Sequence, residues 1–135
     1  MANWYGQSRS NYFKVLDEVA FREWAESRDL EVMEKPDGLF AVAPSSMSED
    51  GSWPSSTWDE DNEEYVNFDF FAEAAEHLAE GQVAVLMTIG NEKLRYLTGF
   101  AVALAWDGRR TMVDIYNIYD KVLTEFGVKT TAAEY

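Results

Sequence analysis

Carboxylates dominate the chemistry that this 135-residue chain could perform. Between Lys35 and Lys93 there is no lysine or arginine, yet residues 36–92 contain 13 aspartates and glutamates. The rest of the chain holds 12 acids and 11 bases, so nearly all of the net charge of −14 comes from this central block. Like charges repel, so the block should be well solvated or should face a partner of opposite charge.

The first part of the block is a stretch rich in serine, aspartate and glutamate, and we expect residues 44–64 to form a long surface loop. Aromatic side chains stand among the acids, and they either anchor a partner or fold back and cap the sheet. The aromatic candidates are Trp53, Trp58 and Tyr65. The acidic candidates of the loop are Glu49, Asp50, Asp59, Glu60, Asp61, Glu63 and Glu64.

A second acidic group follows at helical spacing. Asp69, Glu73, Glu76 and Glu80 fall at i, i+4, i+7 and i+11, which predicts one charged stripe on a helix. Neighbours on that stripe would lie about 4.5–6 Å apart along the axis. Phosphates of a nucleic-acid strand carry one charge per ~3.4 Å, so the stripe could imitate a phosphate backbone. The simpler interpretation is the solvated face of an amphipathic helix.

Other carboxylate chemistry finds less support. Asp59, Asp61 and Glu63 alternate as in a calcium loop, but Glu64 and Phe70 stand where that motif needs Gly and Glu. The single histidine, His77, has no cysteine or second histidine as a catalytic partner, and we expect it to be partly buried or paired at the surface. We therefore predict no metal, no cofactor and no catalytic residues. A hydrolase that uses a carboxylate pair stays open as an alternative.

The bases of the second half also lie close together in the sequence. Lys93 and Arg95 fall on one expected strand, and Arg109 and Arg110 on the next. They are expected to balance acids on the sheet rather than to bind an anion. A strongly acidic chain repels nucleic acid and anionic membranes, so we predict no direct contact with either.

The pattern of expected strands and helices predicts one α+β domain over residues 1–135. We expect an antiparallel or mixed sheet of about six strands, with the helices mainly on one face. The order β-α-β-β-loop-α-β-β-β-α begins like a ferredoxin-like split β-α-β. The expected strands are 11–15, 30–35, 38–44, 82–89, 93–106 and 109–115, and the expected helices are 17–28, 65–80 (or 67–80) and 114–126.

Turn and capping residues fix the expected boundaries. Asp17 and Asp114 are placed to cap the first and last helices, and Gly81 and Gly127 to end the second and third. Pro36-Asp37-Gly38 and Asp107-Gly108 predict hairpin turns, because these residues suit the required backbone angles.

Composition limits the remaining possibilities. Apolar residues make up 47% of the chain and aromatic residues 15%, which is typical of a folded domain. The absence of cysteine excludes disulfides and thiolate metal sites. No apolar run is long enough to span a membrane, and we see no signal peptide. We expect a cytoplasmic monomer or homodimer.

The opening "ANWYG…RSNYF", followed by a capped helix and a strongly acidic centre, resembles small accessory proteins of phages, plasmids and integrative elements. Some of these are anti-restriction or anti-CRISPR inhibitors that mimic the charge of DNA. The resemblance implies a non-enzymatic inhibitor whose partner is a basic, nucleic-acid-binding protein or complex. The alternatives are the carboxylate hydrolase and a structural or assembly adaptor of a mobile element that binds through its aromatic residues.

Overall fold

The computed structural model describes residues 5–45 and 51–133. It confirms an α+β fold with antiparallel strand pairing, in the order β-α-β-β-β-β-α-β-β-β-α. The strands are β1 (Tyr5–Ser10), β2 (Leu30–Lys35), β3 (Leu39–Pro44), β4 (Ser56–Asp59), β5 (Glu64–Asn67), β6 (Val83–Glu92), β7 (Tyr96–Ala105) and β8 (Arg110–Asp114). The helices are α1 (Glu18–Ser27), α2 (Phe70–Glu76) and α3 (Asn117–Phe126).

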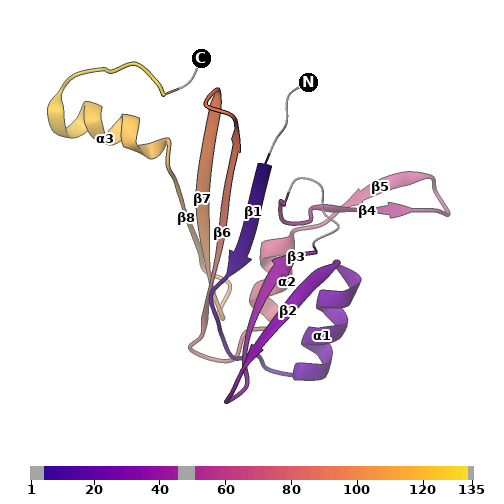
Figure 1. Cartoon of the computed structure of the whole chain (residues 1–135). Helices are drawn as coiled ribbons and strands as arrows, with labels where there is room; N and C mark the ends of the chain where they lie inside the picture. Colours follow the sequence, from indigo (N-terminus) through magenta and orange to yellow (C-terminus); the bar gives the residue numbers. More distant parts are fainter. Residues whose placement is uncertain (1–4, 46–50, 134–135) are drawn as a thin grey trace.

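The main sheet has four strands rather than about six. Its order is β1-β6-β7-β8, and the hairpins β2–β3 and β4–β5 form separate two-stranded sheets (Figure 1). The strand next to β1 is the one that follows the second helix, as in a split β-α-β, but no ladder joins the β2–β3 hairpin to β1. The ferredoxin-like start is therefore not formed as one continuous sheet.

The first strand lies earlier than predicted. Residues 11–15 make only isolated bridges, from Phe13 to Phe40 and from Val15 to Leu78. The side chain of Asn11 ends the ladder, because its amide donates to the Val83 carbonyl and accepts from the Val85 N–H. The ladder itself runs through serines, with Ser8 hydrogen-bonded to Thr88 at 2.7 Å, and these residues gave no hydrophobic signal for a strand.

The core lies on one face of the main sheet. Leu86, Val102 and Leu104 are fully buried there and belong to one cluster with side chains of α1, α2 and β3. The opposite face, which we call the outer face, carries Met87, Ile89 and Val113, all more than half exposed. α1 and α2 contribute to the core, whereas no residue of α3 is buried.

Two of the predicted hairpins and the first helix are confirmed. Asp17 caps α1 by accepting the Ala20 N–H at 3.2 Å. Asp37 and Gly38 both have a φ of 72° in the turn between β2 and β3. The turn at Asp107-Gly108 joins β7 to β8.

The other two helices differ from the prediction at their ends. α3 ends at Gly127 in the left-handed conformation as expected, but Asp114 does not cap it. Its carboxylate accepts the Tyr116 N–H instead and stabilises the turn before the helix. α2 covers only Phe70–Glu76, because residues 64–67 before it belong to β5. The backbone after the helix, from His77 onward, forms hydrogen bonds with residues 14–16. Gly81 therefore does not cap the helix.

No helix in the described ranges has the length and apolar character needed to cross a bilayer.

Gly51 joins the segment before β4 to β1, and this contact can be tested. A Cβ at Gly51 would overlap the Gly6 carbonyl, and its φ of +69° also disfavours other residues. We expect Gly51→Ala to lower the free energy of unfolding by about 2–4 kcal/mol, from overlap and backbone strain together. Gly108→Ala is the control, because its φ is also positive but a Cβ there meets no atom within 4 Å. Chemical denaturation should show a cost of only about 1 kcal/mol for the control; equal costs would contradict this account.

Candidate partner-binding surface

Much of the predicted loop 44–64 is a hairpin. β4 pairs with β5 from Ser56–Asn67 to Asp59–Glu64, so the acidic sequence forms a narrow two-stranded projection. Asp59 builds the tip: its carboxylate accepts the N–H groups of Asp61 and Asn62 and the Asn62 side-chain amide at 2.8 Å. These hydrogen bonds hold the pKa of Asp59 below its usual value. We call residues 56–67 the acidic hairpin.

The acidic hairpin projects away from the rest of the molecule (Figure 1). None of its residues is buried. The backbone at its base is closed by a hydrogen bond from the Phe68 N–H to the Ser55 carbonyl. A two-stranded hairpin without further packing has marginal stability, so a binding partner would add support that the domain does not supply.

The charges at the tip are uncompensated. Within the described ranges, the ion pairs involve none of Glu60, Asp61, Glu63 and Glu64. All four are exposed to solvent. Glu49 and Asp50, predicted as part of the same group, lie outside the described residues. The structure thus gathers four free carboxylates at one projecting end.

Two aromatic residues lie directly behind this tip. Trp58 and Tyr65 are cross-strand partners whose ring centroids are 4.9 Å apart in an edge-to-face arrangement. They remain 50% and 70% exposed, which is unusual for rings of this size. An acidic tip beside exposed aromatic rings suits a basic partner, because arginine can both pair with carboxylates and stack on rings.

Trp53, the third aromatic candidate, belongs to the core. It is 8% exposed and stacks on Phe70 at 5.5 Å. Phe70 in turn stacks on Trp24, so one row of rings joins α1, α2 and the segment before β4. The sequence left open that both tryptophans fold back onto the domain. Trp53 does so, and Trp58 does not. Trp53 therefore positions the hairpin and is not exposed as an anchor.

The acidic stripe expected on the second helix is not formed. Asp69 caps α2 through the Ala72 N–H and pairs with Arg110 at 2.9 Å. Glu80 lies beyond the end of α2 at Glu76, so it does not continue the helical spacing. Of the four predicted residues, Glu76 and Glu80 are exposed without an ion pair among the described side chains.

Glu73 is the most constrained of these acids. Its carboxylate accepts the Trp24 indole N–H at 2.8 Å and two guanidinium N–H groups of Arg28 at 2.9 Å. The Arg28 bond, aided by Trp24 and opposed by partial burial, lowers the pKa of Glu73. Arg28 also lies over the ring of Phe68, at 3.7 Å from its centroid. Glu73 is therefore a structural residue that links α1 to α2.

The sequence interpretation missed Arg28, and it expected Arg110 to balance acids on the sheet, whereas Arg110 pairs with Asp69 at the start of α2. Both arginines come from outside the run without bases, and each reaches an acid more than 40 positions away, Glu73 and Asp69 respectively. Residues 36–92 contain no lysine or arginine, but some acids in this block are nevertheless paired with bases from elsewhere in the chain. Neither ion pair follows the i, i+4 spacing by which sequence predicts salt bridges.

His77 ends α2 and is surrounded by rings. Its imidazole lies 5.0 Å from Trp24 and 6.2 Å from Phe21, centroid to centroid. Burial lowers the pKa of His77, with Glu76 and Glu73 opposing the shift. Across residues 5–45 and 51–133, no three acidic or histidine side chains gather closely enough to hold a metal ion.

The chain matches no protein-family model, and comparison with curated proteins and with solved structures finds none that is similar. The function is therefore argued from the geometry of the molecule.

The structural role of Glu73 gives a prediction in pH. We expect Glu73→Gln to lower the free energy of unfolding at neutral pH by about 1–3 kcal/mol, because it weakens two charge-assisted contacts. The lowered pKa means that Glu73 stabilises the native state above its ordinary value of 4.5 and loses this effect as pH falls through the folded pKa. The stability of Glu73→Gln should therefore decline less steeply in acid, as measured by denaturation at several pH values. Glu76→Gln, on an exposed neighbour, should change stability by less than about 0.5 kcal/mol; equal effects of the two variants would refute the assignment.

Proposed function

We propose that this chain is a non-enzymatic acidic inhibitor that inserts its acidic hairpin into the nucleic-acid-binding surface of a bacterial defence nuclease or effector complex. The observation that carries the proposal is the tip itself. Glu60, Asp61, Glu63 and Glu64 are free of cations, and they stand on a projection narrow enough to enter a groove. An anti-CRISPR or anti-restriction protein that mimics DNA would act through such a surface.

The chemistry of recognition follows from what a nucleic-acid groove contains. Such grooves are lined by lysine and arginine that neutralise phosphates, and carboxylates can take the place of those phosphates. Trp58 and Tyr65 offer rings on which a guanidinium or the apolar part of a lysine can pack. Asp69 and Glu73 are already neutralised by Arg110 and Arg28, so they contribute little.

Removing charge from the tip should abolish binding without unfolding the protein. The test variant carries Glu60→Gln, Asp61→Asn, Glu63→Gln and Glu64→Gln. The matched control removes four exposed acids elsewhere, at Glu23, Glu26, Asp37 and Asp120. Each protein serves as bait in affinity capture from bacterial lysate, followed by mass spectrometry. We expect the native and control baits to retain a nucleic-acid-binding protein that the tip variant does not.

The same capture reveals the mode of binding. Retention should fall steeply between low and high salt, because exposed charges are screened within about 8 Å at physiological ionic strength. Added duplex DNA or RNA should release the partner by competing for its groove. A partner that stays bound to the tip variant, resists salt and ignores nucleic acid would contradict the proposal. If Trp58→Ala and Tyr65→Ala alone abolished that binding, the structural adaptor would be the better interpretation.

A further inference from the structure

The outer face of the main sheet is an apolar surface whose large side chains remain exposed in the described part of the chain. Met87, Ala101 and Val113 are direct neighbours across β6, β7 and β8, and Ile89 lies beside them. Met87, Ile89 and Val113 are 56%, 62% and 59% exposed. Contiguous exposed apolar surface of this kind marks an interaction site.

The charge of this face is as informative as its apolar character. Alternation along the four strands places no aspartate or glutamate side chain on it, although the whole chain has 25 acids. Its single charged side chain is Arg9, next to Met87 on β1, and the ion pairs of the described residues do not include Arg9. The face therefore suits an apolar element with a carboxylate at its margin.

α3 is such an element, and large apolar side chains on it are also exposed among the described residues. Ile118, Leu123 and Phe126 are 53%, 54% and 71% exposed, and none of the ten residues of the helix is buried. A helix this short is marginal in water unless its apolar stripe packs against something. Asp120 lies on the same helix, has no ion pair among the described residues and is the carboxylate that could meet Arg9, whereas Glu125 is already paired with Lys121 at 3.1 Å. At ~1.5 Å per residue the helix is about 15 Å long, close to the width of a four-stranded sheet with strands ~4.8 Å apart.

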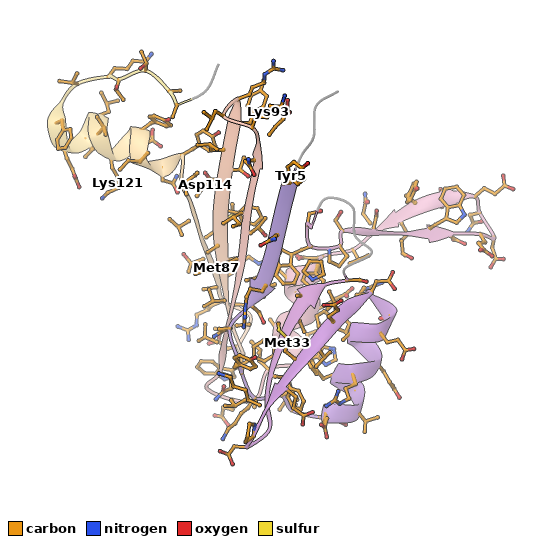
Figure 2. All side chains as sticks on the ribbon, in the orientation of Figure 1. Tyr5, Met33, Met87, Lys93, Asp114 and Lys121 are labelled. Carbon is orange, nitrogen blue, oxygen red and sulfur yellow. The ribbon has the colours of Figure 1, made fainter. Side chains whose placement is uncertain are left out.

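Within one chain the two surfaces are held apart. The Ile115 N–H donates to the Gly99 carbonyl at 2.9 Å, and the Tyr116 hydroxyl donates to the Leu97 carbonyl at 2.7 Å. These bonds fix the start of α3 at one end of β7. Figure 2 shows Lys121 on α3 well apart from Met87 on β6. The helix cannot lie over Met87 of its own sheet unless this junction opens.

We propose that a second copy of the chain covers the outer face, with α3 of each subunit packed on the main sheet of the other. In a two-fold symmetric dimer, the outer face of each subunit meets α3 of the other subunit, so both surfaces are buried in both subunits. Seven large apolar side chains on these two surfaces and at their junction are more than half exposed: Met87, Ile89, Val113, Ile115, Ile118, Leu123 and Phe126. A stable interface buries about 800 Å² per partner, and a two-fold contact approaches this area by burying the sheet patch and the helix patch of each subunit at once. The proposal does not depend on the function of the acidic hairpin.

The oligomeric state in solution tests the proposal directly. Light scattering and sedimentation equilibrium should give twice the mass of one chain for the native protein. Met87→Lys on the sheet and Leu123→Lys on α3 should each raise the dimer dissociation constant at least about tenfold, because each places a charge in an apolar contact. Val19→Lys is the control, since Val19 is 66% exposed on α1, away from both surfaces. Circular dichroism confirms that each variant is folded.

Cross-linking then identifies which elements touch. The chain has no cysteine, so Met87→Cys and Leu123→Cys introduce unique thiols. When isotope-labelled Met87→Cys chains are mixed with unlabelled Leu123→Cys chains, we expect a cross-link between the two chains. Val19→Cys paired with Leu123→Cys should give none. Three results would overturn the proposal. The native protein could be a monomer at all concentrations, or the dimer could be unaffected by both lysine substitutions. The third is a cross-link that forms only within one chain that carries both cysteines.

Salt separates this interface from the acidic hairpin. Two subunits of charge −14 repel one another, so added salt should leave the dimer unchanged or strengthen it. Binding through the hairpin should weaken under the same conditions. Failure of one proposal is thus distinguishable from failure of the other.

Discussion

The carboxylate of Glu73 is the point on which the arrangement of this molecule depends. It ties Trp24 and Arg28 of the first helical region to α2, and Arg28 lies over Phe68 at the base of the acidic hairpin. The rings of Trp24, Phe70 and Trp53 stack beside it. Because a charged group at partial burial must keep its partners, this network fixes where the hairpin leaves the body. The free acids can then project while the internal ones stay neutralised.

Local signals in the sequence account for much of the fold. Asp17, Asp37-Gly38, Asp107-Gly108 and Gly127 act within a few residues of themselves, so their turns and ends were predicted correctly. The position of strand β1 and the early end of α2 were not predicted, because both depend on hydrogen bonds to residues far away in the sequence. Asn11 bonds to β6, and the chain after His77 bonds to residues 14–16. β4 and β5 have four residues each, too few for an alternating pattern to show.

The candidate site shows the same division between local and distant causes. Sequence located the acids at Glu60, Asp61, Glu63 and Glu64 and their aromatic neighbours, but it treated the whole block as one surface. Ion pairs with Arg28 and Arg110 remove Glu73 and Asp69 from that surface, and Trp53 is buried in the ring stack. What distinguishes a free carboxylate from a structural one here is a base more than 40 positions away. No spacing rule within the block could reveal that difference.

The central claim is that the acidic hairpin, and not the body of the domain, meets a basic protein surface. Hydrogen–deuterium exchange of the chain, alone and saturated with the nucleic-acid-binding protein it captures, tests this most directly. Backbone amides of an unsupported hairpin exchange rapidly, and contact with a partner slows them. We predict new protection concentrated in residues 56–67, with α2 unchanged. Protection of α2 or another part of the body, with the hairpin exchanging as fast as in the free chain, would contradict the claim.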